Sequence, residues 1–191
     1  MNPSDTHTDA RPKRADARRN EEKLIAAARE AFAENGVAAS LEDIARRAGV
    51  GIGTLYRHFP TRPALLEAVY LEEVQEICAS ADRFAAADPW EALTGWLRLY
   101  AGFAATKRAL FDELLPHIGQ DAEVFTSCKT VIRATGDALL HRAQEAGAVR
   151  PDVTFMDVAR MVGGIAVIRM AEQDEIERIL EVALDGLRPR A

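Results

Sequence analysis

The stretch from Ser40 to Phe59, SLEDIARRAGVGIGTLYRHF, decides the fold of this chain. Ser40 is a good helix N-cap, and Asp43 follows it three positions later, so a short helix is expected to begin here. Ile44 lies on the inner face of this helix, and Gly49 ends it. A second short helix after the turn is anchored by Leu55. Helices of this length are unstable alone, so packing against neighbours must hold them.

Two short helices joined by a tight turn predict a helix-turn-helix. Gly53 is expected to help the two helices approach closely. When the long aliphatic side chains point inward, Thr54, Tyr56, Arg57 and His58 remain for another partner. A rigid, shallow unit of this kind suits the major groove of DNA.

Further helices flank this stretch on both sides. A preceding helix over about 17–34 carries an apolar stripe and ends at Asn35-Gly36. Pro60 blocks the second short helix, and Thr61 then caps a long fourth helix with Pro63 in its first turn. No segment alternates with period two, so we expect an all-α fold of about nine helices. The remaining helices are predicted at 90–105, 107–115, 121–146, 154–171 and 173–187.

The net charge of −6 alone argues against nucleic-acid binding, but the charge is unevenly distributed. Residues 1–62 carry eleven Lys and Arg against nine Asp and Glu, whereas residues 63–191 carry thirteen against twenty-one. A protein with a mildly basic N-terminal part and an acidic remainder would approach a polyanion with its N-terminal part first. We therefore expect a disordered basic arm over 1–16, a DNA-binding domain over 17–62, and a helical domain over 63–191.

Neither a transmembrane run of apolar residues nor a signal peptide is apparent, so a cytoplasmic protein without membrane contact is expected. Cys78 and Cys128 lie on separate predicted helices without metal-ligand spacing. Free buried thiols are the favoured reading, with a disulfide or a redox sensor as the alternative. No metal site, cofactor or catalytic pair is predicted, so we do not expect an enzyme.

Taken together, these motifs resemble the TetR family of transcriptional repressors over about residues 21–69. The combined spacing of the motifs carries the resemblance; beyond the fourth helix only length and helical layout match. One departure is Gly51, where the family commonly has Ser or another capping residue at the start of the recognition helix. The matching motifs are Phe32-Ala33-Glu34-Asn35-Gly36, Leu41-Glu42-Asp43-Ile44-Ala45, Gly49-Val50, Gly53-Thr54-Leu55-Tyr56, His58-Phe59-Pro60 and Leu65-Leu66.

The resemblance implies a regulator, expected to be a repressor, that binds a palindromic operator as a homodimer and is released by a small apolar or amphipathic effector. A dimeric regulator or activator without such an effector stays open. Arg57 is the best candidate for direct readout, because a guanidinium can bond both acceptors of guanine. His58 could instead be a core histidine, and Arg46 and Arg47 a solvated face. The implied DNA contacts are Ser40, Gly53, Thr54, Tyr56, Arg57, His58, Thr61 and Arg62.

The last two predicted helices are apolar on more than one face, which favours a second neighbour for each. The resemblance implies that this pair meets its mate in a four-helix bundle, and burial within one chain is the alternative. The interface candidates are Phe155, Val158, Val162, Ile165, Ile176, Leu180 and Leu184.

The middle helices hold most of the aromatic residues, and in the resembled family such a bundle encloses a ligand cavity. An apolar pocket with a few convergent polar groups is the usual form of such a site. Trp90, Trp96 and Phe111 could equally be core residues. The effector-pocket candidates are Trp96, Tyr100, Phe103, Phe111, His117, Phe125 and Cys128.

Overall fold

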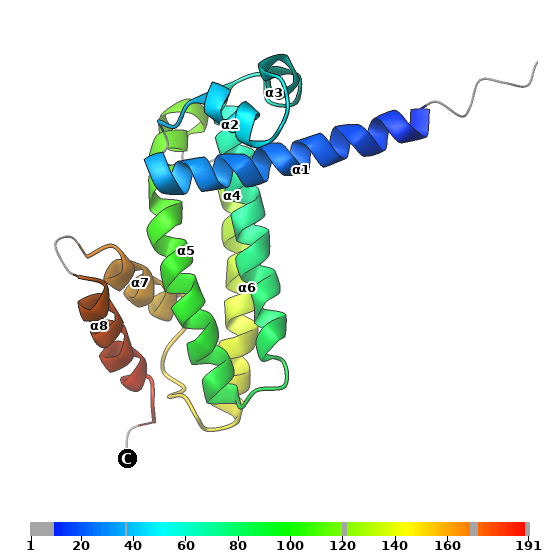
Figure 1. The fold of residues 1–191 in the computed structure, drawn as a ribbon. Coiled ribbons are helices and arrows are strands. Elements are labelled where there is room, and N and C mark those ends of the chain that lie inside the picture. Colours follow the sequence, from blue (N-terminus) through cyan, green and yellow to red (C-terminus); the bar gives the residue numbers. More distant parts are fainter. Residues whose placement is uncertain (1–9, 37, 120–121, 169–171, 190–191) are drawn as a thin grey trace, which may run out of the picture. The chain divides into compact units, whose positions relative to one another are not determined.

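The computed structural model describes residues 10–36, 38–119, 122–168 and 172–189. These ranges form eight α-helices and one short 3-10 helix, without strands, which is the predicted all-α class (Figure 1). The chain divides into two compact units, Met1–Val69 and Tyr70–Ala191. The division falls inside α4 (Arg62–Ala79), later than the predicted boundary at Arg62, because the start of α4 groups with the first unit.

The first unit contains α1 (Ala10–Asn35), α2 (Leu41–Arg47) and α3 (Ile52–His58) in addition to the start of α4. α2 packs against both α1 and α3. The predicted apolar stripes are confirmed, since their side chains form the core of this unit. The core residues with no exposed surface are Leu24, Ala28, Ala31, Ile44, Leu55, Leu65, Leu66 and Val69.

α1 begins earlier than predicted. The sequence suggested an arm over 1–16, whereas the helix starts at Ala10. Pro12 lies in the first turn of α1, where a missing backbone N–H costs no intrahelical hydrogen bond. The alanines that follow, Ala15 and Ala17, favour helix. Residues 1–9, and the side chains of 10–14, lie outside the described residues.

The second unit contains the rest of α4, the 3-10 helix η1 (Ser80–Phe84), α5 (Pro89–Ile118), α6 (Glu123–Glu145), α7 (Phe155–Ala166) and α8 (Gln173–Asp185). α5 packs against α6 and α7, and α8 packs against α7 (Figure 1). Gly136 lets α6 approach α7 closely: a Cβ atom there would lie 2.1 Å from the ring of Phe155.

α5 is a single helix, although the sequence suggested two helices separated near Thr106. The Thr106 hydroxyl donates to the carbonyls of Phe103 at 3.0 Å and Gly102 at 3.4 Å, so its polar group is satisfied without a break. Pro116 stands in the last turn and is tolerated there. α7 ends at Ala166 rather than at 171, and residues 169–171 lie outside the described residues.

Within the described ranges, no helix combines the length and the apolar character needed to cross a bilayer.

Candidate nucleic-acid interface

The turn between α2 and α3 is fixed by backbone geometry. Gly49 has φ +69°, a left-handed conformation that favours glycine. The Gly49 N–H donates to the Arg46 carbonyl at 3.1 Å, and the Val50 N–H donates to the Ala45 carbonyl at 3.0 Å. These two bonds complete a Schellman motif and satisfy carbonyls at the end of α2. The angle between α2 and α3 is therefore set by hydrogen bonds rather than by a flexible loop.

An arginine ties α2 to the end of α1. The Arg47 guanidinium contacts Asp43 at 2.7 Å and Glu34 at 2.7 Å. Its hydrogen bonds hold the pKa of the Asp43 and Glu34 carboxyls below their usual range, and Arg46 adds to the effect at Asp43. The Arg47 side chain is 26% exposed and that of Arg46 77% exposed. Arg46 therefore fits the solvated face that the sequence suggested. Arg47 instead links α2 to the end of α1 through its ion pair with Glu34.

The outer face of α3 carries the predicted DNA-contacting side chains. Tyr56 is 47% exposed, Arg57 is exposed, and Thr54 and His58 are half-buried. Arg57 folds back along the helix, with Nε donating to the Gly53 carbonyl at 3.2 Å and Nη2 to Thr54 Oγ1 at 3.3 Å. These bonds are long and exposed, so the guanidinium can leave them for a stronger acceptor at small cost.

Gly53 does not have the packing role that the sequence suggested. It is exposed, and a Cβ atom built there meets no heavy atom within 4 Å. The close approach of α2 and α3 therefore does not depend on glycine at this position. The missing side chain leaves open space on the same outer face as Tyr56 and Arg57.

The two candidate DNA-contacting hydroxyls outside α3, those of Ser40 and Thr61, form hydrogen bonds within the chain. The Ser40 hydroxyl accepts from the Asp43 N–H at 3.3 Å and donates to Glu42 at 2.8 Å, so it caps α2 as predicted. Thr61 accepts from the Ala64 N–H at 3.3 Å and caps α4.

Arg62, predicted as a phosphate clamp, is partly engaged within the chain. Both terminal nitrogens of its guanidinium donate to the Ala39 carbonyl, one of them at 2.8 Å. Arg62 therefore holds the loop that precedes α2, and less of its donor capacity is left for a phosphate.

The interface candidates of the second unit separate into two groups. Phe155, Val158, Val162, Leu180 and Leu184 are at most 5% exposed within the single chain, and Ile165 and Ile176 are half-buried. The five buried side chains form the unit's own core, which was the alternative reading. The exposed large apolar side chains on α7, α8 and the residues just after α7 are Val167, Ile168, Ile179 and Val182.

The effector-pocket candidates also separate. Trp96 is fully buried, and its Nε1 donates to the Ile77 carbonyl at 2.9 Å, so it belongs to the core. His117 is exposed in the last turn of α5. Phe125 and Cys128 are buried, whereas Tyr100, Phe103 and Phe111 keep part of their surface exposed.

These aromatic rings form two groups: Tyr100 and Phe103 contact each other, and Phe125 contacts both Tyr70 and Phe111. The ring centroids of Tyr100 and Phe103 lie 5.9 Å apart, those of Phe111 and Phe125 4.7 Å apart, and those of Tyr70 and Phe125 5.4 Å apart. Such spacings are typical of favourable aromatic pairs. Phe111 of α5 and Phe125 of α6 are thus brought together with Tyr70 of α4, whereas Tyr100 and Phe103 pair with each other.

Sequence reasoning missed Lys107, whose Nζ lies 4.6 Å from the Tyr70 ring centroid and 5.0 Å from that of Phe103. A signal was available. Lys107 follows Phe103 by four residues and precedes Phe111 by four, so it interrupts the aromatic stripe of α5.

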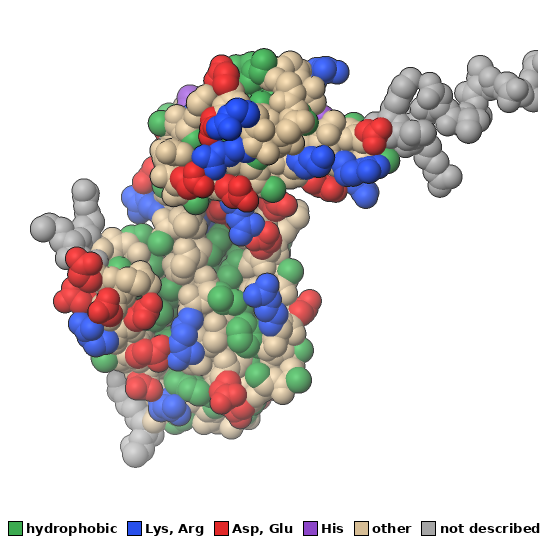
Figure 2. Space-filling model, in the orientation of Figure 1, with side chains coloured by type: hydrophobic (Ala, Val, Ile, Leu, Met, Phe, Trp, Pro, Cys, Tyr) green, Lys and Arg blue, Asp and Glu red, His purple; other side chains and the backbone are tan. Residues whose placement is uncertain are grey.

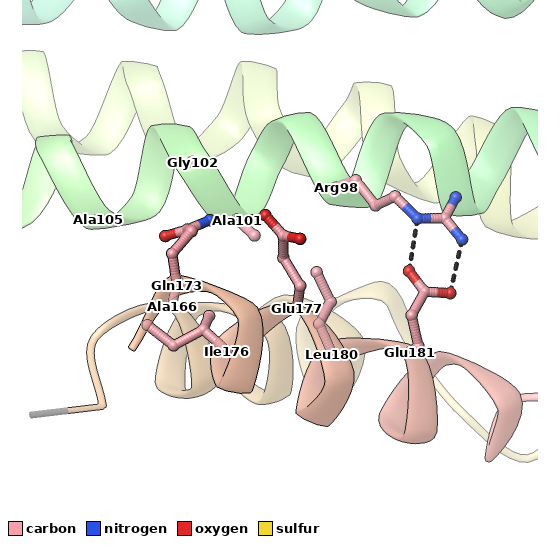
Figure 3. Close-up of a pocket in the computed structure, with 10 residues that line it drawn as sticks. All are labelled: Arg98, Ala101, Gly102, Ala105, Ala166, Gln173, Ile176, Glu177, Leu180 and Glu181. Carbon is pink, nitrogen blue, oxygen red and sulfur yellow. Dashed lines mark hydrogen bonds and ion pairs between the residues drawn. The ribbon is translucent and has the colours of Figure 1, made fainter. Parts of the chain in front are cut away.

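A separate pocket of about 440 Å³ lies between α5 and α8 (Figure 3). At one end Arg98 forms a bidentate ion pair with Glu181, at 2.7 and 2.8 Å. The interface candidates Ile176 and Leu180 line the pocket, whereas none of the seven effector-pocket candidates does. Figure 2 shows acidic side chains gathered over α8, where Asp174, Glu175 and Glu177 are exposed.

In the part of the chain that the structure describes, no three His, Cys, Asp or Glu side chains are grouped so that they could hold a metal ion. No disulfide joins Cys78 to Cys128, which is buried.

Comparisons with known proteins agree with this architecture. Residues 24–69 match the family model described as bacterial regulatory proteins of the tetR family, and residues 88–189 match the C-terminal domain of SbtR-like transcriptional regulators. A curated relative, the HTH-type transcriptional regulator UidR of Escherichia coli K12, is 26% identical, with 95% of this chain and 92% of the relative covered.

Two solved structures are more similar. The TetR transcriptional regulator SCO0520 from Streptomyces coelicolor is 39% identical with a TM-score of 0.75, and covers 90% of this chain and 99% of its own. A TetR transcription regulatory protein from Mycobacterium vanbaalenii is 38% identical with a TM-score of 0.74, and covers 93% and 100%. With an N-terminal helix-turn-helix of the required geometry and matches over both units, the chain belongs to the TetR family of DNA-binding transcriptional regulators.

Proposed function

We propose that this regulator is a repressor that binds a palindromic operator as a homodimer and leaves it when a small molecule binds the second unit. The outer face of α3 carries the proposal. α3 is seven residues long, too short to be stable alone, and it is held by the turn at Gly49 and by the buried Leu55. The fold therefore supports a short, rigid helix whose exposed side faces a partner.

The proposed contacts follow from chemistry at each position. Tyr56 would bond a phosphate through its exposed hydroxyl, while Arg57 would leave Gly53 and Thr54 to bond guanine acceptors. Gly53 would let the helix backbone approach the base edges. The Thr61 hydroxyl, which can still donate, and the positive end of the α4 dipole would favour a phosphate on the flanking backbone.

One helix-turn-helix contacts few base pairs, so a specific site requires two copies of the first unit on two half-sites. Exposed apolar residues support a contact through α7 and α8. Four of the eight large hydrophobic side chains exposed in the described ranges lie on or beside these helices, and Val182 is 75% exposed. We propose that Ile179, Val182 and their neighbours, rather than the five buried candidates, form the centre of the interface.

The dimer contact can be tested with a charge at its proposed centre. Val182→Asp should give monomers in sedimentation velocity, because a carboxylate would be buried without a partner. Val131→Asp on α6 is the matched control, since Val131 is also an exposed apolar residue, at 49%, and should leave the dimer intact. A Val182→Asp protein that stays dimeric would exclude this surface.

Effector release is supported by the aromatic side chains of α5, of which Tyr100, Phe103 and Phe111 remain partly exposed. Operator fragments can be obtained by sequencing the genomic DNA that the purified protein retains. With such a fragment, fluorescence anisotropy in the presence of a metabolite panel tests release. A ligand that stabilises the free protein should also lower operator affinity, because it favours a conformer unsuited to DNA.

A further inference from the structure

The ammonium of Lys107 bridges the two ring groups of the second unit. Its Nζ stands over the rings of Tyr70 and Phe103, and the side chain is half-buried on α5. Among the described residues, Lys107 forms no direct hydrogen bond or ion pair; its Nζ faces two rings, and the Glu73 carboxylate acts on it from beyond ion-pair distance. A half-buried cation in this situation has no directly paired counter-ion.

This arrangement is costly for the folded chain. Cation–π contacts recover only part of the free energy that removing an unpaired ion from water costs. Burial accordingly lowers the pKa of Lys107 to about 8. Even so, the amine remains mostly protonated at neutral pH, so the site keeps a positive charge. Strongly perturbed groups of this kind are more frequent at functional sites than in ordinary cores.

The other titratable groups around Lys107 do not neutralise it. α4 contributes the Tyr70 hydroxyl, Glu73 and Cys78, α5 contributes Tyr100, and α6 contributes Cys128. Glu73 and the two thiols favour the charged amine, but their combined effect is smaller than that of burial. Burial raises the pKa of the Tyr70 and Tyr100 phenols, so both stay neutral near pH 7.

From this geometry we infer that the effector of the second unit is a small aromatic carboxylate whose anionic group pairs with Lys107. The inference rests on the proposed function, in which this unit binds the releasing ligand. A flat ring would stack beside Tyr100 and Phe103, which are partly exposed, while the carboxylate supplies a directly paired counter-ion. Both halves of such a ligand match groups that the fold already brings together.

The test compares probes of one shape and different charge. Benzoate and 1-naphthoate are titrated against benzamide and 1-naphthamide by thermal shift and calorimetry near neutral pH. Each carboxylate should bind at least about tenfold more tightly than its amide. Lys107→Met should remove this preference, while Lys129→Met, at an exposed lysine on α6, should keep it.

Two further measurements separate binding from folding. Without ligand, Lys107→Met should unfold at the same temperature as the wild type or higher, since a buried charge is lost; a clear decrease would identify Lys107 as a structural ion and overturn the inference. In the wild type, benzoate affinity should fall as pH rises through about 8, because the amine loses its charge there. Equal binding of carboxylates and amides, or no binding of either carboxylate at about 10 mM, would also overturn it.

These titrations are made on the free dimer or monomer without DNA. A protein that binds its operator but shows no carboxylate preference would refute the ligand class alone. A protein that prefers carboxylates but does not bind DNA would refute the proposed regulation and leave the Lys107 site intact.

Discussion

Gly53→Ala should raise stability and lower operator affinity at the same time. Glycine inside a helix is less favourable than alanine by about 0.8–1.0 kcal/mol. The new methyl group at position 53 meets no atom within 4 Å, so no clash offsets this gain. Since Gly53 is in the first turn of α3, we expect a gain of about 0.5–1 kcal/mol, or about 1–4 °C in Tm.

The effect on DNA has the opposite sign if α3 lies in the major groove. A methyl group on the outer face would push the helix away from the base edges and lengthen the bonds of Tyr56 and Arg57. Losing one good base contact costs about 1–3 kcal/mol, which is about a tenfold loss of affinity or more. The two effects can be read on one preparation by thermal unfolding and by anisotropy with an operator fragment.

Gly102→Ala is the matched control. Gly102 is an exposed glycine within α5, and a Cβ atom there also meets nothing within 4 Å. This variant should gain stability without losing operator affinity. If Gly53→Ala is stabilised and binds DNA as tightly as the wild type, the outer face of α3 is not against the duplex, and the proposed orientation is wrong.

Three further outcomes follow from the structure. Tyr56→Phe should weaken operator binding by about 1 kcal/mol in a gel-shift titration, with helicity and Tm unchanged; unaltered affinity would remove the phosphate bond. Gly136→Ala should destabilise by about 1–3 kcal/mol in urea unfolding, because its methyl group would overlap the Phe155 ring; unchanged stability would show that the contact relaxes freely. Arg47 lowers the pKa of Asp43, so this pair stabilises the fold above the ordinary carboxyl pKa of about 4 and ceases to do so as pH falls through the lowered value. In the Asp43→Asn variant, the urea concentration at the unfolding midpoint should therefore fall less on acidification than it does in the wild type. An equally large fall in both proteins would contradict this.

The first unit could be predicted closely because its signals are local. Ser40 caps α2, Gly49 supplies the left-handed turn, and Thr61 caps α4, each through contacts within a few residues. The roles of Gly53 and Arg62 could not be predicted in this way. These roles depend on the tertiary neighbours of each residue. Gly53 has open space beside it, and the Arg62 guanidinium lies against the Ala39 carbonyl.

The second unit was harder to predict for two physical reasons. A helix that is apolar on two faces does not reveal which face meets its own chain, so Phe155 and Leu184 were assigned to the interface although they are core residues. A lysine is exposed by default, so Lys107 was passed over despite its place in the aromatic stripe. The predicted break near Thr106 failed because its hydroxyl bonds within the helix.

The positions of the tryptophans allow events in the second unit to be followed by tryptophan fluorescence. Its only two, Trp90 and Trp96, both lie in the second unit, so tryptophan emission carries no direct signal from the DNA-reading helices. Trp96 is sealed from water and stacks on Tyr100 at 5.6 Å, next to the proposed ligand position, whereas Trp90 lies under the Arg188 guanidinium at 4.1 Å. A change in tryptophan emission on adding unlabelled operator would thus show that DNA binding at the first unit alters the surroundings of a tryptophan in the second.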